Sequence, residues 1–501
     1  MKSATKTEIG ENMLVQSLSV ELTKIEQKMK KATTYEEWKK NALEHDEVSG
    51  RKEWKNKAKS SDYDYVNIQT RLKEIRSLRE AGDDIGLLFA LNEGIHGNMG
   101  GMGKSVLYER AKFGTKTLIE QYVDELVTSL QHISSLPENE IPFEEKLDFF
   151  ERASHCFGRS ALMLSGAGSL GHFHTGVVKT LLKHGLMPAV ISGSSAGSVL
   201  AGVLGTHTEQ ELEELLDKGM MIPGQKSIEE ESVGLRRPQV DVNDVHQMLK
   251  DMIPDMTFQE AYEKTGRLIN VTIAPAEQHQ TSRLMNATTS PNVFIRTAVL
   301  ASCAVPGVFP PVMLMAKNVF GEAQPYLPNR RWVDGAVTDD LPAKRLARLY
   351  GVNHYIVSQA NPLALMIKKS DEYWFAPTGV KNVVRHAGRE VLRSGEKFSR
   401  RYLSPWPGVS KAMNMFYSVA AQNYTGDVNI TPSFSFVDPQ KLLGHLTIKE
   451  MEELSGEGER STWANLEQIR ISSKVGKCLD MILDHHSDHD VKRIYKKRKL
   501  L

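Results

Sequence analysis

Apolar positions along the chain separate a helical part from a part in which strands and helices alternate. Between residues 31 and 135, apolar residues recur every three or four positions, the spacing of amphipathic helices. Thr34-x-x-Glu37 has the spacing of a helix capping box, and Ser61-Asp62 is placed to cap a later helix. Residues 1–30 have the pattern of a single polar helix. The first part of the chain is therefore predicted to be all helical.

From residue 160 onward, short apolar or β-branched runs alternate with helical sequence. These runs are Ala161–Leu164, Ala189–Ile191, Leu268–Ile273 and His354–Val357. Such alternation predicts an α/β domain with a mainly parallel sheet. Past Pro362 the chain becomes basic and helical. We therefore predict a polar N-terminal helix or tail (1–30), a helical domain with its linker (31–150), an α/β domain (155–360) and a helical C-terminal region with a basic tail (361–501).

Composition narrows the class of protein. Lys and Arg total 63 against 62 Asp and Glu, a balance that argues against a dedicated nucleic-acid binder. Three cysteines in 501 residues exclude a disulfide scaffold and suit a reducing compartment. The N-terminus has no apolar core of a signal peptide. The two long uncharged stretches, 185–207 and 297–316, are interrupted by glycines or prolines, so we expect no transmembrane helix.

The strongest chemical signal is the pentapeptide Gly193–Gly197, which reads G-x-S-x-G with Ser195 at its centre. It follows a predicted strand and precedes the apolar helical run Ser198–Gly205, which is the context of a nucleophile elbow. The tight turn strains the serine backbone, and Gly193 and Gly197 are needed because a Cβ would collide with neighbouring backbone. We therefore predict that Ser195 is a nucleophile; the alternative is an ordinary Gly/Ser turn.

A second glycine-rich loop, Gly166–Gly171, also follows a predicted strand. Its G-x-G-x-x-G pattern fits a dinucleotide-binding turn, but the next strand ends at Ser192–Ser194 without the required carboxylate. The alternative is an oxyanion hole, in which backbone N–H groups face a developing negative charge. We favour the oxyanion hole, and its residues are Gly166, Ala167, Gly168, Ser169 and Gly171. A serine nucleophile also needs a base, and Asp334-Gly335-Ala336 supplies a candidate.

Together, the glycine-rich loop, G-x-S-x-G and the later Asp-Gly-Ala resemble the patatin-like phospholipase family. The run Ala301–Pro311 is similar to the segment that precedes the family's Asp-Gly, and the match covers about residues 160–352. Residues 31–135 resemble the helical domain found before the patatin unit in fungal and plant triacylglycerol lipases. The matching pieces are Tyr35–Trp38, Tyr63–Tyr65, Asn98–Gly101 and Gly114–Lys116.

The resemblance implies a three-layer α/β/α core and a Ser195–Asp334 dyad that hydrolyses acylglycerol esters through an acyl-enzyme, with no metal and no cofactor. The family's loop has three successive glycines and then a basic residue, whereas this chain has Ala167 and Leu170 at those positions. This departure favours triacylglycerol over phospholipid as substrate. The alternatives are a phospholipase A or lysophospholipid acyltransferase using the same dyad, and a non-catalytic lipid-surface scaffold. A triad through His354, His386 or His445 is a further possibility that a dyad does not need.

Three other motifs carry weaker signals. Gly103-Lys104-Ser105 resembles a P-loop, but Asn98 stands where the first glycine is required, so we expect no nucleotide. The His- and Asp-rich run 484–490 has no distinctive metal-ligand spacing. A row of cations recurs every four residues, as expected of a basic amphipathic helix on a lipid surface or of a solvated helix face. Its members are Lys381, Arg385, Arg389, Arg393, Lys397 and Arg401. We accordingly predict an intracellular, cytoplasmic protein in peripheral contact with a membrane or lipid droplet.

Overall fold

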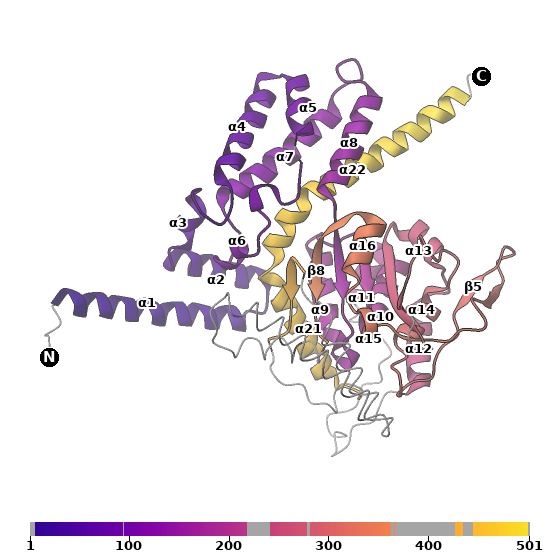
Figure 1. The fold of residues 1–501 in the computed structure, drawn as a ribbon. Coiled ribbons are helices and arrows are strands. Elements are labelled where there is room, and N and C mark those ends of the chain that lie inside the picture. The colour runs from indigo at the N-terminus through magenta and orange to yellow at the C-terminus, as the bar shows by residue number, and fades with distance from the viewer. Residues whose placement is uncertain are drawn as a thin grey trace, which may run out of the picture. The chain divides into compact units, whose positions relative to one another are not determined.

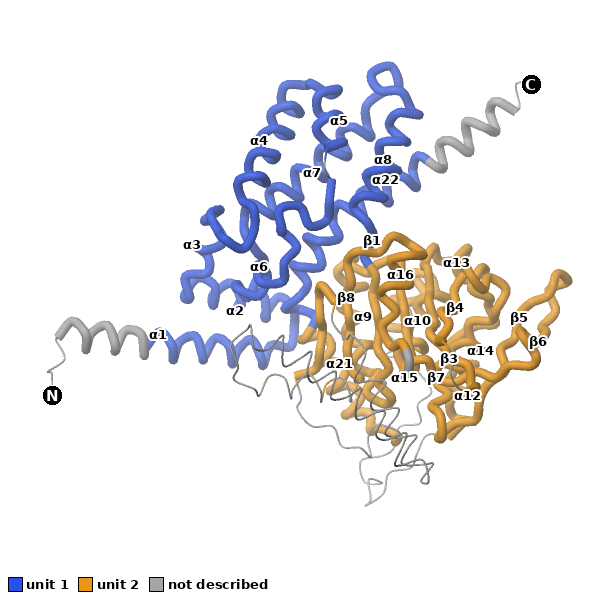
Figure 2. Tube along the Cα trace, viewed as in Figure 1, with its two compact units in different colours: residues 1–160, 462–501 blue, residues 161–461 orange. Residues whose placement is uncertain are grey.

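The chain folds into two compact units. The computed structural model describes residues 6–93, 95–217, 241–277, 281–361, 365, 426–433 and 444–498 (Figure 1). One unit comprises residues 1–160 and 462–501, and the other comprises residues 161–461 (Figure 2). The last part of the chain thus groups with the N-terminal helices, a pairing that local sequence patterns do not reveal.

The first unit is helical, as predicted. Thr34 caps the second helix by accepting a hydrogen bond from the Glu37 N–H. The cap of the fourth helix is Asp64, which accepts from the Asn67 N–H, so the prediction of Ser61-Asp62 was wrong by two residues. The elements are α1 (Lys6–Lys31), α2 (Tyr35–Val48), α3 (Arg51–Asn56), α4 (Tyr65–Ala81), α5 (Asp84–Asn92), η1 (Met99–Gly101), α6 (Val106–Glu109), α7 (Thr117–Ser135), α8 (Phe143–Phe157) and α22 (Leu466–Arg498).

The core of this unit is completed by the final helix. Residues Ile471, Val475, Leu479 and Ile482 of α22 recur at helical spacing and are buried with residues of α4, α5, α7 and α8. The apolar stripe of α22 therefore covers a core that the N-terminal helices leave open, although more than 300 residues separate them in sequence.

The second unit is built on a sheet whose described strands number seven. The order is β4-β3-β2-β1-β8-β9, and β7 pairs with β3. Pairs β1–β2, β2–β3 and β8–β9 are parallel, while β4 and β7 run antiparallel to β3, so the predicted mainly parallel sheet is confirmed. The strands are β1 (Arg159–Leu164), β2 (Val190–Gly193), β3 (Leu268–Pro275), β4 (Arg283–Met285), β7 (Trp332–Asp334), β8 (Val352–Ser358) and β9 (Val428–Ile430).

Helices cover both faces of this sheet. Ala161 and Met163 of β1 are buried with Leu346 of α16 on one face. On the other face, α10 packs so closely on β3 that a Cβ on Gly205 would overlap Ile269. The helices of this unit are η2 (Gly168–Gly171), α9 (His172–Lys183), α10 (Ala196–Thr206), α11 (Glu209–Asp217), α12 (Val242–Met252), α13 (Phe258–Thr265), α14 (Ile295–Ser302), α15 (Ala336–Asp339), α16 (Ala343–Tyr350) and α21 (Ile448–Trp463).

A two-stranded hairpin, β5 (Met315–Lys317) with β6 (Ala323–Pro325), stands apart from the main sheet. In Figure 1 it extends away from the helices and strands of the second unit. No helix within the described part of the chain is long and apolar enough to cross a membrane.

Candidate active site

Two parallel strands deliver the nucleophile candidate and the glycine-rich loop to the same edge of the sheet. Leu164 at the end of β1 is in register with Gly193 at the end of β2. Loops that follow parallel neighbours leave the sheet side by side, which is where open α/β folds place their sites. Ser195 and the Gly166–Gly171 loop therefore meet above the strand ends.

The turn around Ser195 has the strained geometry of a nucleophile elbow. Ser195 has φ 49° and ψ −123°, a conformation that residues with a side chain seldom adopt. A Cβ on Gly193 would overlap the Gly197 carbonyl, and a Cβ on Gly197 would overlap the Leu164 carbonyl. The two glycines are thus required because neighbouring backbone approaches them closely, which explains why the pattern has glycine at both positions.

Residues of the α14 C-terminus hold the elbow in place. The Ser302 hydroxyl accepts a hydrogen bond from the Ser195 N–H at 2.9 Å and donates to the Thr272 carbonyl at 2.8 Å. The Cys303 thiol donates to the Ser195 carbonyl at 3.6 Å. Such bonds supply the external support that a strained backbone needs. Sequence reasoning did not identify Ser302 or Cys303 individually, although both lie in the Ala301–Pro311 run.

Asp334 reaches Ser195 from β7. It ends this strand opposite Ile273, and its N–H donates to the Ala304 carbonyl at 2.9 Å. The carboxyl accepts a hydrogen bond from the Ala336 N–H at 2.8 Å, and the Ser195 side chain lies near enough to lower its pKa. A Cβ on Gly335 would overlap the Thr272 backbone, so the glycine allows the chain to turn closely against β3. The structure thus brings together the two residues predicted as a dyad.

Burial dominates the electrostatics of Asp334. Its exposed fraction is 3%, and burial raises its pKa to about 7, against the lowering effect of the hydrogen bonds from Ala336 and Ser195. A carboxyl with a pKa near neutrality is matched to accepting and returning a proton at physiological pH. Burial, and then the Asp334 charge, also raise the pKa of the Cys303 thiol to about 12, so this thiol stays protonated.

The glycine-rich loop lies against the elbow. A Cβ on Gly166 would come within 3.5 Å of Ser195 Cβ, and one on Gly171 within 3.0 Å of Ala196 Cβ. Gly168 has φ +55° in the left-handed region, where glycine is favoured. From Gly168 the chain enters the short turn η2, so the first N–H groups of that turn have no partner inside it.

A second buried carboxyl, Asp340, anchors the start of this loop. Its Oδ1 accepts from the Gly166 N–H at 2.7 Å, and its Oδ2 accepts from the Asn361 amide at 3.0 Å. Burial raises its pKa to about 7, and both hydrogen bonds oppose the rise. Sequence reasoning missed Asp340 and Asn361, since contacts over such sequence separations leave no local pattern; the one signal was a second acidic residue shortly after Asp334.

Three of the described histidines, His174, His354 and His445, lie near groups other than Ser195 and Asp334. His174 is fully buried between the Ser358 hydroxyl at 2.7 Å and the Ser165 carbonyl at 3.0 Å, and burial lowers its pKa to about 4. His354 lies four residues before the active-site end of β8, near Asp427. His445 lies 3.6 Å from Asp244. His386 lies outside the described residues, as does the whole cation row from Lys381 to Arg401.

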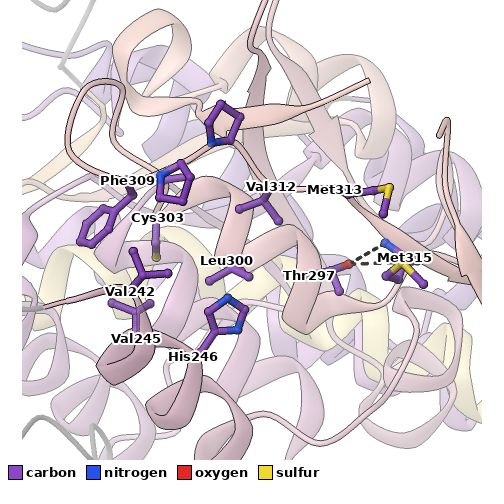
Figure 3. Close-up of a pocket in the computed structure, with 13 residues that line it drawn as sticks. Val242, Val245, His246, Thr297, Leu300, Cys303, Phe309, Val312, Met313 and Met315 are labelled. Atoms are coloured by element: carbon purple, nitrogen blue, oxygen red, sulfur yellow. Dashed lines mark hydrogen bonds between the residues drawn. The ribbon is translucent and has the colours of Figure 1, made fainter. Parts of the chain in front are cut away.

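An apolar pocket of about 360 Å³ is lined by residues that contact the backbone of Ser195 and Asp334 (Figure 3). Cys303 and Ala304 line it, and these residues hydrogen-bond the backbone of Ser195 and Asp334, respectively. In Figure 3, α14 contributes Leu300 and Thr297 to the pocket wall. The remaining lining residues are Val242, Val245, His246, Phe309, Pro310, Pro311, Val312, Met313 and Met315. An apolar cavity beside a nucleophile has the character of a binding site for a hydrocarbon chain.

Fold and site together define an α/β protein with a serine on a strained strand-to-helix turn and a neighbouring buried aspartate. The family model that matches residues 162–347 is described as patatin-like phospholipase, and residues 17–155 match a domain of unknown function, DUF3336. Similar curated proteins include triacylglycerol lipase SDP1L of Arabidopsis thaliana, at 32% identity over 91% of this chain and 58% of that protein. Triacylglycerol lipase ptl3 of Schizosaccharomyces pombe is 30% identical over 89% of this chain and 94% of its own length.

The chain belongs to the patatin-like phospholipase family. These matches confirm the resemblance seen in the sequence, including the N-terminal helical domain. The similarity spans both parts of the chain: triacylglycerol lipase ptl2 of Schizosaccharomyces pombe is 30% identical over 92% of this chain and 75% of its own length. The chain spans less than two thirds of the length of several relatives, among them SDP1L.

Proposed function

We propose that this protein is a serine lipase that hydrolyses the fatty-acyl esters of acylglycerols, with triacylglycerol as the preferred substrate. The observation that carries the proposal is the placement of the buried Asp334 carboxyl beside Ser195, which stands on a strained turn. This is the arrangement required of a nucleophile and its base. Ser195 is the nucleophile and Asp334 the proton acceptor.

In the acylation step, Ser195 Oγ attacks the ester carbonyl carbon and its proton passes to Asp334. The tetrahedral intermediate collapses when the C–O bond to the glycerol oxygen breaks, and Asp334 returns the proton to that oxygen. A water molecule then gives a proton to Asp334 and attacks the acyl-enzyme. The fatty acid leaves as Ser195 regains its proton, so the dyad is restored.

Backbone N–H groups of the glycine-rich loop stabilise the oxyanion in this scheme. The Gly166 N–H is engaged by Asp340, so we assign the donor role to Ala167, Gly168 and Ser169. The N–H groups of Gly168 and Ser169 lie in the first turn of η2 and lack partners within that turn. A single donor of this kind is worth about 100- to 1,000-fold in turnover. Gly171 serves by its close packing on Ala196.

The pocket beside Cys303 is the proposed acyl site. Its lining is almost entirely apolar, which suits a fatty-acyl chain better than a polar head group. The names of the relatives point to triacylglycerol, and Leu170 adds no cation to the oxyanion loop that would favour a phosphate. The described Cys156, Cys303 and Cys478 are free thiols, in keeping with an intracellular protein that contacts a membrane or lipid droplet peripherally.

A product analysis tests this proposal. The purified chain is incubated in parallel with triacylglycerol, diacylglycerol and phosphatidylcholine emulsions, and released fatty acid is measured for wild type and Ser195→Ala. We expect release from triacylglycerol that depends on Ser195. Preferred release from phosphatidylcholine would transfer the assignment to a phospholipase A. Transfer of the acyl group to added lysophospholipid would indicate an acyltransferase, and no Ser195-dependent product would leave a non-catalytic lipid-surface scaffold.

A further inference from the structure

The β5–β6 hairpin exposes two large apolar side chains at its tip. The strands pair in the register Met315 with Pro325 and Lys317 with Ala323, and the turn 318–322 joins them. Val319 is 93% exposed and Phe320 is 83% exposed, the highest values among the described large hydrophobic residues. Figures 1 and 2 show the hairpin extending away from the elements of its own unit. Neighbouring exposed apolar residues on a projecting element are typical of an interaction site.

Four N–H groups of this turn, those of Asn318, Phe320, Gly321 and Glu322, are hydrogen-bonded within it. Asn318 Oδ1 accepts from the Phe320 and Glu322 N–H groups, both at 2.9 Å. The Asn318 N–H donates to the Glu322 carbonyl, and the Gly321 N–H donates to the Asn318 carbonyl. Because an unpaired N–H costs several kcal/mol in hydrocarbon, a turn that enters an apolar phase needs such internal pairing. Four of the five N–H groups in the turn 318–322 meet this requirement.

The hairpin is continuous with the wall of the apolar pocket. Met315, the first residue of β5, lines the pocket together with Met313 and Val312, as Figure 3 shows. The Met315 N–H donates to the Thr297 hydroxyl at 3.2 Å, which ties this strand to α14. At the rise of a β-strand, Phe320 lies at most about 17 Å along the chain from Met315. A surface that binds the hairpin tip would therefore lie close to the apolar pocket.

The charged side chains of the hairpin indicate which kind of surface its tip can bind. Within residues 317–325 the charged side chains are Lys317 and Glu322. Lys317 forms an ion pair with Glu260, and the Glu322 carboxylate accepts from the Asn318 amide. The hairpin therefore offers an apolar tip without an unpaired cation, which suits a neutral or zwitterionic lipid surface.

We propose that the β5–β6 hairpin inserts Val319 and Phe320 into the acyl-chain layer of a lipid–water interface and so brings the apolar pocket to its substrate. The inference rests on the proposed lipase function for the identity of the surface. The driving force is burial of apolar side chains, so binding needs no anionic lipid and tolerates high salt.

The test is flotation of the full chain with phosphatidylcholine vesicles in 0.1 M and 1 M salt, concentrations at which the Debye length is about 10 Å and about 3 Å. The variants are Val319→Ser/Phe320→Ser and, as matched control, Phe89→Ser, which changes a Phe on α5 that is 69% exposed. Full burial of each tip side chain raises the partition coefficient onto vesicles by about tenfold or more. The double variant should therefore have a partition coefficient roughly a hundredfold lower than wild type at both salt concentrations. Phe89→Ser should bind as wild type.

A second variant reports insertion directly. In Phe320→Trp, the added tryptophan should be quenched by phosphatidylcholine brominated on its acyl chains, beyond the quenching of wild type, whereas in Phe89→Trp it should not. Equal partitioning of wild type and double variant, or equal quenching at both positions, would overturn the inference. So would a concentration-dependent oligomer, without lipid, that the double substitution abolishes, because the tip would then bind a second copy of this chain.

Hydrolysis of a short soluble ester separates this inference from the proposed function. The tip residues belong to the hairpin turn and do not line the apolar pocket, so the double variant should hydrolyse the soluble ester at the wild-type rate. A wild-type chain that binds vesicles through its tip but hydrolyses no ester would refute the lipase proposal alone. A chain that hydrolyses esters but floats equally well without the tip would refute the hairpin proposal alone.

Discussion

Replacing the buried Asp334 carboxyl with its neutral isostere should change turnover and stability in opposite directions. Asp334→Asn keeps an oxygen that accepts the Ala336 N–H, but it cannot take the Ser195 proton. Loss of a general base costs about 100- to 10,000-fold in rate. We therefore expect kcat/KM for a short soluble ester to fall by at least about 100-fold.

The stability effect follows from the pKa of Asp334, which burial raises from 3.8 to about 7 in the folded protein. Because the folded pKa exceeds the unfolded value, the carboxyl contributes most to stability below about pH 4. That contribution is lost as the pH rises to about 7. At about 1.4 kcal/mol for each pKa unit, the buried carboxyl lowers the free energy of unfolding at pH 8 by up to about 4 kcal/mol relative to its value at low pH. Asp334→Asn should therefore stabilise the fold at pH 8 and change it little at pH 4.

Two assays measure these effects. Urea unfolding at pH 4 and pH 8 gives the free energy of unfolding of wild type and variant, and ester hydrolysis between pH 5 and pH 9 gives the rate profile. For wild type, kcat/KM should fall about tenfold per pH unit below about pH 7, where Asp334 becomes protonated. Asp340→Asn, which keeps an acceptor for the Gly166 N–H, should retain this acidic limb. An acidic limb near pH 4, or an Asp334→Asn variant less stable than wild type at pH 8, would refute the reasoning.

Three further substitutions test other parts of the site. Gly197→Ala places a Cβ against the Leu164 carbonyl, so displacement of the elbow should cost about 100-fold in turnover, measured with a soluble ester on protein shown to be folded. Leu300→Trp fills part of the 360 Å³ pocket and should shift the preferred acyl chain towards shorter esters, as measured with a chain-length series; an unchanged preference would place the acyl chain elsewhere. His354→Ala should leave kcat within a few-fold of wild type, and a loss as large as that of Asp334→Asn would require a triad.

Local pattern was sufficient for much of the fold and for the elbow. The apolar runs near β1, β2, β3 and β8 were predicted because buried strands have a local composition, and Ser195 because its turn requires small neighbours at fixed offsets. The pairing of Ser195 with Asp334 came from the family resemblance, since the two residues are far apart in sequence.

Other features depend on contacts that sequence spacing does not encode. The anchoring of Gly166 by Asp340 joins residues 174 positions apart, and the stripe of α22 closes a core formed by the first part of the chain. Val319 and Phe320 look like core residues by composition, yet they are exposed because a short hairpin carries them outward. In each case tertiary position, rather than local propensity, decides the environment of the side chain.

The central claim is that Ser195 is a nucleophile activated by Asp334, and active-site labelling tests it most directly. The chain is treated with a fluorophosphonate, which forms a covalent bond with activated serines, and the modified residue is located by mass spectrometry of its peptides. The account predicts modification of Ser195 in wild type, much slower modification in Asp334→Asn and none at this position in Ser195→Ala. Stoichiometric labelling of another residue, or labelling of Ser195 at the wild-type rate in Asp334→Asn, would contradict it.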